Sequence, residues 1–193
     1  MNPNQIRKNK MEKLLIVLDL DETLIHATTR EDIGREPDFR IEEWKVFRRL
    51  FLKPFLDFCF ENFRVGVWTS AGSLFADAVV SESMNNRNLE FVWSSERCTR
   101  TYDIERFEYF PQKDLKKLIK NGYQKEKILA VDDTPEKWAQ SYGNYIQVSE
   151  FRGKSNDSEL DILMRYLNTL TNCENVRCIE KRNWRENTIN STD

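Results

Sequence analysis

Two aspartates follow the first apolar run of the sequence and stand two residues apart. In an extended chain, residues i and i+2 point to the same side, so we expect Asp19 and Asp21 to face one way. Neighbouring carboxylates repel each other and favour a cation or a proton between them. Carboxylate oxygens suit Mg²⁺, which often accepts a phosphate oxygen as a further ligand. Taken alone, the pair is also compatible with polar residues that only end a strand.

Further polar groups follow later strand ends or precede helix starts. The hydroxyl of Thr69 is able to bond a phosphoryl oxygen, although a threonine at such a place is commonly an ordinary turn residue. The ammonium of Lys113 is able to offset negative charge, although most such lysines are solvated. The adjacent Asp132 and Asp133 need a cation or a helix N-terminus to compensate their charge. Because Thr134 already offers a helix cap, the cation is the better explanation.

Five short apolar runs are typical of strands that are buried on both faces. They cover Leu14 to Leu18, Val65 to Trp68, Phe91 to Trp93, Ile128 to Val131 and Tyr145 to Val148. Helical patterns alternate with them, over Leu74 to Met84, Leu115 to Asn121, the stretch after Thr134 and Asp157 to Leu170. This alternation predicts an α/β fold with a parallel sheet between two layers of helices. Ligands of such sheets lie beyond the carboxyl ends of the strands, where the polar groups stand.

Capping residues precede the first three helical patterns. Ser73, Asp114 and Thr134 each offer a side-chain oxygen to the first free N–H groups. Helical periodicity places Leu74 and Ile119 among the residues that face the sheet.

A chain of 193 residues fits a single domain, with a core over about residues 14–170. A partial alternation within about 26–52 predicts a small antiparallel insertion after the first strand, and no large cap domain. Its aromatic residues Phe39, Trp44 and Phe47 are candidates for a substrate pocket, although packing against the core is the commoner role. The tail over about 171–193 is polar and predicts either a packed or a partly disordered segment.

Composition excludes several kinds of site and partner. Lys and Arg number 30 and Asp and Glu 32, and the net charge of −2 indicates neither a nucleic acid nor a membrane as partner. A local basic patch of Arg48, Arg49 and Lys53 is the one exception. The single histidine, His26, excludes most catalytic zinc centres. Residues 1–13 show no signal peptide and no apolar run is long enough to span a membrane, so we expect a cytoplasmic protein, or a nuclear one in a eukaryote.

The motifs together resemble those of the haloacid-dehalogenase-like (HAD) phosphotransferases. The resemblance is closest to the NLI-interacting-factor-like branch, which includes the TFIIF-associating and small C-terminal-domain phosphatases, and it extends over about Leu14 to Leu170. It rests on the segments Leu18-Asp19-Leu20-Asp21-Glu22-Thr23-Leu24-Ile25-His26, Leu52-Lys53-Pro54-Phe55-Leu56, Val67-Trp68-Thr69-Ser70-Ala71, Lys113-Asp114-Leu115 and Asp132-Asp133-Thr134-Pro135.

The resemblance implies a phosphoryl transfer in two steps. Asp19 is the implied nucleophile, which forms an aspartyl-phosphate, and Asp21 the implied general acid and base. Thr69, Ser70 and Lys113 are the implied ligands of the phosphoryl oxygens. The implied cofactor is Mg²⁺, and its implied ligands are the Asp19 carboxylate, the Asp21 backbone carbonyl, Asp132 and Asp133. The sequence does not assign the direct ligand within the Asp132–Asp133 pair.

The resemblance implies a phosphatase for phosphoserine or phosphothreonine in proteins, so the expected partner is a phosphoprotein or phosphopeptide. Two alternatives stay open: a phosphatase for nucleic-acid ends or small metabolites, and a non-catalytic binding module. Relatives carry an arginine upstream of the motif lysine, and neither Arg97 nor Arg100 matches it cleanly. His26 has either a structural or a catalytic role.

Overall fold

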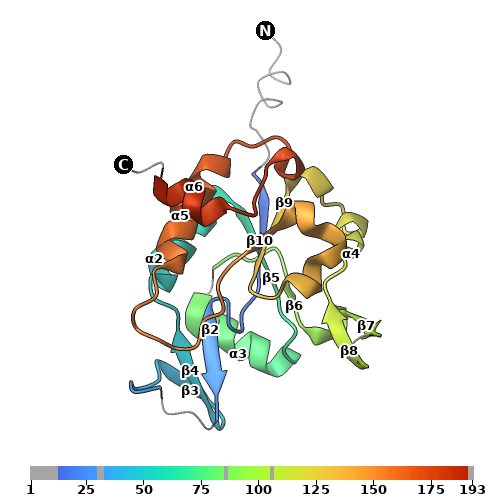
Figure 1. Cartoon of the computed structure of the whole chain (residues 1–193). Coiled ribbons are helices and arrows are strands. Elements are labelled where there is room, and N and C mark those ends of the chain that lie inside the picture. The colour runs from blue at the N-terminus through green and yellow to red at the C-terminus, as the bar shows by residue number, and fades with distance from the viewer. Residues whose placement is uncertain (1–12, 30–32, 85–86, 105–106, 191–193) are drawn as a thin grey trace.

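The computed structural model describes residues 13–29, 33–84, 87–104 and 107–190, with a parallel sheet of five strands at its centre (Figure 1). The strands lie in the order β10-β9-β1-β5-β6. They coincide with the five predicted apolar runs, and their ends differ from the prediction by at most one residue. The strands are β1 (Leu15–Leu18), β5 (Arg64–Trp68), β6 (Val92–Trp93), β9 (Ile128–Asp132) and β10 (Tyr145–Gln147).

Helices cover both faces of this sheet, which confirms the predicted α/β architecture. In β1, Ile16 and Leu18 pack with α2, α3, α5 and α6, whereas Leu15 and Val17 pack with α4 and η4. The α-helices are α2 (Leu52–Asn62), α3 (Ser73–Met84), α4 (Lys116–Lys120), α5 (Glu159–Leu170) and α6 (Trp184–Asn190). The 3₁₀ helices are η2 (Ser95–Arg97), η3 (Lys125–Lys127), η4 (Pro135–Asn144) and η5 (Val176–Cys178).

The predicted insertion after the first strand is a three-stranded antiparallel sheet in the order β2-β4-β3. Its strands are β2 (Ile25–Thr28), β3 (Phe39–Ile41) and β4 (Trp44–Arg48), and Ala27 lies opposite Val46 in the register. Residues 30–32 of the insertion lie outside the described residues. The part of the chain that the structure describes contains no large cap domain, in agreement with the prediction.

Helix α2 and a hairpin of β7 (Thr99–Asp103) and β8 (Glu108–Gln112) are additional to the predicted elements. The hairpin forms a sheet of its own, beside the central one in Figure 1. Its polar strands and Pro111 give it no apolar pattern that predicts a strand. β8 leads directly into Lys113, so the hairpin positions one of the predicted site residues.

The tail packs against the core over the residues that the structure describes. Trp184 in α6 is buried, and its indole N–H donates to the Gln147 carbonyl of β10 at 2.8 Å. Its ring lies beside that of Tyr166 in α5. Of the two predicted states of the tail, the packed one therefore holds for residues 171–190.

Three local predictions about helices are wrong. Leu74 is 87% exposed and Ile119 is 41% exposed, because they lie in the first turn of α3 and near the end of the short helix α4, where the packed face no longer covers them. The Thr134 side chain does not cap η4. Instead, the Thr134 backbone N–H donates to Asp132 Oδ1 at 3.0 Å. The carboxylate of the last residue of β9 thus accepts a free N–H group at the start of η4.

Close packing in the central sheet explains the glycine at position 66. A Cβ atom at Gly66 in β5 would lie 2.5 Å from the ring of Phe91, so a larger residue would displace that ring. No helix among the described residues is both long and apolar enough to cross a membrane.

Candidate active site

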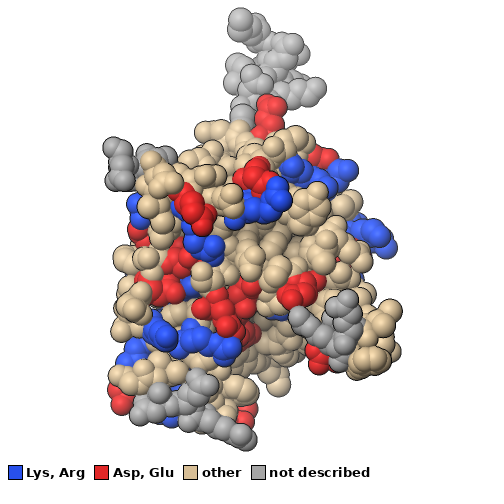
Figure 2. Space-filling view, in the orientation of Figure 1, with Lys and Arg blue, Asp and Glu red and all other residues tan. Residues whose placement is uncertain are grey.

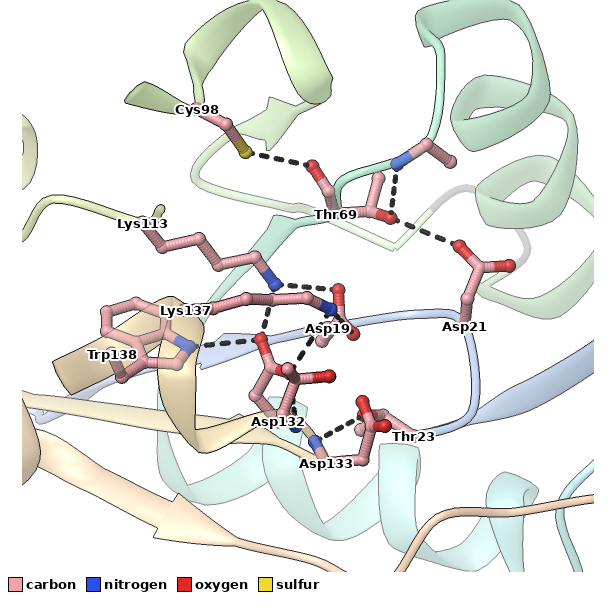
Figure 3. A network of polar contacts seen from close by, with 12 residues as sticks. Asp19, Asp21, Thr23, Thr69, Cys98, Lys113, Asp132, Asp133, Lys137 and Trp138 are labelled. Atoms are coloured by element: carbon pink, nitrogen blue, oxygen red, sulfur yellow. Dashed lines mark hydrogen bonds and ion pairs between the residues drawn. The ribbon is translucent and has the colours of Figure 1, made fainter. Parts of the chain in front are cut away.

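The carboxyl ends of three adjacent strands bring the predicted site residues together (Figure 3). Leu18 of β1 is in register with Val67 of β5 and with Val131 of β9. The residues that follow these positions therefore emerge at one edge of the sheet, which places Asp19 beside Asp132. Parallel pairing alone explains why segments more than a hundred residues apart meet here.

An acidic cluster forms at this edge. One carboxylate oxygen each of Asp19, Asp132 and Asp133 lies within 4.8 Å of the others. Asp19 is 2% exposed and Asp132 is fully buried. The Thr23 hydroxyl fixes Asp133, because it accepts the Asp133 backbone N–H at 3.1 Å and donates to Oδ1 at 3.3 Å. Three converging carboxylate oxygens fit the hard-oxygen coordination of Mg²⁺.

Two lysines balance this negative charge. Lys113 Nζ donates to Asp19 Oδ1 at 2.7 Å and to Asp132 Oδ2 at 2.5 Å. Lys137 Nζ lies 3.4 Å from the second oxygen of each of these carboxylates. The Lys113 backbone N–H donates to the Lys137 carbonyl at 2.8 Å, which holds the two lysines side by side. The Trp138 indole N–H also donates to Asp132, at 3.0 Å.

Burial sets the electrostatics of the carboxylates. Burial first and the Asp132 carboxylate second raise the pKa of Asp19. Burial alone would also raise the pKa of Asp132, but Lys113 and Lys137 outweigh it and leave that pKa below its ordinary value. The pKa of Asp133 is raised to about 6 by burial and by the two neighbouring carboxylates. Asp132 is thus held as the anion that anchors both lysines.

Asp21 lies apart from the acidic cluster, on the side of Thr69. The Thr69 hydroxyl donates to Asp21 Oδ2 at 3.2 Å and accepts the Ala71 backbone N–H at 3.1 Å. Burial, followed by the charges of Asp19 and Glu22, raises the pKa of Asp21 to about 7. The predicted general acid is therefore half protonated near neutral pH. Its carboxylate is not part of the group of three that could hold a metal ion.

The other predicted site residues make no contact with the catalytic cluster among the hydrogen bonds and ring contacts of the described residues. The Ser70 hydroxyl is buried, and no hydrogen bond links it to the predicted catalytic residues within the described part of the chain. Phe47 is 1% exposed, with its ring beside His26 and under the Arg35 guanidinium, so the structure does not place it on the surface as a pocket residue. Phe39 is half-buried under the Arg48 guanidinium, and Trp44 is 38% exposed with its ring against Phe75.

Arg48, Arg49 and Lys53, the residues of the expected basic patch, line one cavity, where carboxylates pair two of them. Arg49 is buried, with its guanidinium on both carboxylate oxygens of Asp157. Lys53 is paired with Asp57 on the surface of α2. His26 is buried as well, and its Nδ1 lies 2.9 Å from Glu22 Oε1.

The comparisons with known proteins agree with this geometry. Residues 14–177 match the sequence profile of the family described as NLI interacting factor-like phosphatase. The chain belongs to this family. The match covers the whole central sheet and ends in η5, so α6 and the segment before it lie beyond it.

Two relatives of this NLI interacting factor-like chain carry names that refer to C-terminal-domain (CTD) phosphatases. The CTD small phosphatase-like protein 2 of Dictyostelium discoideum is 26% identical over 89% of this chain, and the chain spans only 30% of that relative. The CTD phosphatase-like protein 355R of Invertebrate iridescent virus 6 is 31% identical over 79% of this chain and 98% of its own length.

The solved structure of the fission yeast RNA polymerase II CTD phosphatase Fcp1 has a similar fold. It aligns with a TM-score of 0.58 and 15% identity over 97% of this chain and 53% of its own. The predicted HAD-like fold, with a parallel sheet between helices and without a large cap, is therefore confirmed. At this identity the likeness establishes the fold alone.

Sequence reasoning missed Lys137, Trp138 and the role of Thr23 in this family site. A signal for Lys137 existed, since the first turn of a helix that starts at Pro135 lies against the end of the preceding strand. A lysine in that turn, directly after two aspartates, is in reach of their carboxylates. Nothing in the sequence indicated that the indole N–H of Trp138, the residue after Lys137, would donate to Asp132.

Proposed function

We propose that the chain is a magnesium-dependent phosphomonoester phosphatase that acts through an aspartyl-phosphate on Asp19, with phosphoserine or phosphothreonine in proteins as its substrate. The observation that carries the proposal is the buried Asp19 carboxylate between Lys113 and the Asp132–Asp133 pair, with Asp21 on the other side. A strand end with no catalytic task has no need of this concentration of buried charge.

In the first step, an Asp19 carboxylate oxygen forms a bond to phosphorus while the bond from phosphorus to the leaving alcohol oxygen breaks. The Asp21 carboxyl donates its proton to that oxygen, so the alcohol leaves as a neutral product. A pKa of about 7 keeps this proton available near neutral pH. The Thr69 hydroxyl donates to Asp21 Oδ2 and so holds the carboxyl group of this acid in position.

In the second step, water attacks the phosphorus of the aspartyl-phosphate. Asp21, now ionised, accepts a proton from that water, and the bond between phosphorus and the Asp19 oxygen breaks. Inorganic phosphate leaves and the Asp19 carboxylate is restored. The Lys113 ammonium stays beside Asp19 throughout and compensates the charge that develops on the transferred group.

The residues present fit a magnesium ion. Asp19, Asp132 and Asp133 would hold it through carboxylate oxygens, and the family resemblance adds the Asp21 backbone carbonyl. When bound, the ion supplies positive charge that lets an anionic nucleophile approach an anionic ester. Lys137, which is 14% exposed at the edge of the cluster, carries part of that compensating charge from the protein itself.

A protein substrate is supported by the surroundings of the site. The β7–β8 hairpin, which leads into Lys113, exposes several large apolar and aromatic side chains, as surfaces that contact proteins often do. These side chains are Tyr102, Ile104, Phe107 and Tyr109. The names of the relatives point in the same direction, because they refer to CTD phosphatases, and that of Fcp1 to the CTD of RNA polymerase II.

The test is hydrolysis of para-nitrophenyl phosphate by the wild type and by Asp19→Asn, each with magnesium and with EDTA. We expect activity that requires both the metal and Asp19. Asp161→Asn, on the surface of α5, removes an equal charge and serves as the matched control. Reduction of the reacting enzyme with borohydride should convert an aspartyl-phosphate at position 19 to homoserine, which mass spectrometry detects. Activity that survives Asp19→Asn would disprove the assigned nucleophile.

Substrate class needs a second comparison. We expect phosphoserine and phosphothreonine peptides to be hydrolysed faster than 3′-phosphorylated oligonucleotides and sugar phosphates, at equal concentrations. A clear preference for either of the last two classes would refute the protein substrate while leaving the chemistry at Asp19 intact.

A further inference from the structure

A cavity of about 550 Å³ lies outside the catalytic cluster, between the end of η4, strand β10 and the segment that follows η5. We call it the tail pocket. Its basic lining residues are Arg177, Lys181, Arg182 and Arg185. Figure 2 shows basic side chains in the upper half of the molecule, over the area that α6 and η4 occupy in Figure 1. Three of the four cations lie beyond residue 177, where the family match ends.

Within the described residues, ion pairs with carboxylates involve two of these four basic residues. Arg185 is paired with Glu159, and Arg182 with Glu180 at 2.5 Å. Arg177 Nη1 instead donates to the neutral Asn144 Oδ1 at 2.5 Å. The Arg177 guanidinium is therefore held by a neutral oxygen rather than by a carboxylate.

Lys181 is the second cation of this kind. It is 6% exposed, and its Nζ donates to the backbone carbonyls of Val176 at 2.5 Å and Ile179 at 2.8 Å. Burial, with a contribution from the like charge of Arg177, lowers the pKa of Lys181 despite the opposing effect of Glu180. A buried ammonium of this kind is costly unless an anion compensates it.

The chemistry of the lining selects the anion. The Arg177 guanidinium and the Lys181 ammonium, which neutral oxygens hold, suit a phosphoryl group, because arginine binds phosphate oxygens in pairs through parallel N–H groups. The cavity is larger than one phosphate, and ligand pockets of this size commonly hold a ligand of several residues or rings. Ile179 and the ring of Tyr142, which is 80% exposed, offer apolar surface for the groups that flank the phosphate.

We propose that the tail pocket binds the phosphoryl group of a phosphorylated peptide, separately from the catalytic cluster. One residue spans the two places: Tyr145 lines the pocket, and its hydroxyl donates to the Asp132 carbonyl at 3.0 Å. If the proposed phosphatase function holds, the pocket takes a second phosphorylated residue of the substrate. Binding itself does not depend on hydrolysis.

Cys178 allows a local test in the unaltered protein. It is exposed and lines the pocket, whereas Cys173 is half-buried outside it and serves as an internal reference. The rate of alkylation by iodoacetamide at each cysteine is measured by mass spectrometry. The probes are inorganic phosphate, a synthetic peptide with two phosphoserines and the same peptide without phosphate. We expect the phosphorylated peptide to slow alkylation of Cys178 at least threefold, at concentrations where inorganic phosphate and the plain peptide have little effect.

Arg177→Gln should weaken this protection about tenfold in peptide concentration, as expected for the loss of one charged hydrogen-bond donor. Arg165→Gln, on the exposed face of α5, removes the same charge outside the pocket and should leave protection unchanged. Equal protection by the plain peptide, or none by the phosphorylated peptide, would overturn the proposal. Protection by inorganic phosphate alone would limit the site to the free ion. A protein that shows protection but no hydrolysis would refute the proposed function and leave this site standing.

Discussion

Arg49 connects three separated parts of the chain, and its removal should be the most damaging change outside the catalytic cluster. Its side chain is fully buried. Nε and Nη2 donate to the two oxygens of Asp157 at 3.0 and 2.9 Å, and Nη1 donates to the Thr23 carbonyl at 2.9 Å. Arg49→Met keeps most of the volume and removes all three hydrogen bonds.

The loss of stability follows from the Asp157 carboxylate, which remains without its partner. Breaking a buried ion pair by removing one partner costs about 3–5 kcal/mol, because the other charge is left uncompensated. For a domain of this size, each kcal/mol lowers the melting temperature by about 2–4 °C, so we expect a fall of roughly 6–20 °C. Thr23 also holds Asp133, so activity per folded molecule should fall several-fold as well.

Urea and thermal unfolding of three variants provide the assay. Arg48→Met is the neighbouring control, since within the described residues its guanidinium donates to the Glu82 carbonyl and lies over the Phe39 ring, and its loss should cost about 1 kcal/mol. Arg49→Met combined with Asp157→Asn removes the orphaned charge, while the Asn oxygen still caps Glu159. The double variant should recover about half of the loss. A single variant within 1 kcal/mol of the wild type, or a double variant no better than the single, would refute the reasoning.

Three further predictions concern the site. Lys113→Met removes one of the two lysines that pair with Asp19 and Asp132, and leaves Lys137. It should lower kcat for para-nitrophenyl phosphate by about 10²–10³-fold. An unchanged kcat would exclude a role of Lys113 in charge compensation. Lys137→Met removes a cation that competes for the acidic cluster, so calorimetric titration should give tighter magnesium binding, and weaker binding would contradict this. The neutral form of Asp21 is the acid and exists below its pKa, so kcat/KM should decline above about pH 7, and a profile flat to pH 9 would exclude Asp21 as the acid.

The central sheet was predictable because its strands are buried on both faces and therefore appear as unbroken apolar runs. The place of Asp19, Thr69 and Asp132 followed from the same fact, since parallel strands end at one edge. The β7–β8 hairpin was not predictable, because its residues pair outside the central sheet and are largely exposed. Period-two alternation at the insertion predicted strands correctly, yet it could not tell that His26 and Arg35 would cover the Phe47 ring.

The contacts of single side chains depended on turns that the sequence does not specify. Glu22 reaches His26 because its backbone adopts a left-handed conformation, with φ of 56°, that few non-glycine residues take. Lys137 and Trp138 reach Asp132 because η4 starts directly at the end of β9. These contacts depend on the local course of the backbone rather than on a residue pattern.

The tail has a consequence for the solution behaviour of the molecule. β10 is an edge strand, with β9 as its one neighbour in the sheet, and an open edge is a template for pairing with another chain. The Trp184 indole and the Arg185 guanidinium both occupy the Gln147 carbonyl on this strand. A chain shortened to the family match at residue 177 would lose both donors and uncover the strand. We therefore expect the tail to protect the sheet against intermolecular strand addition, and truncated forms to self-associate.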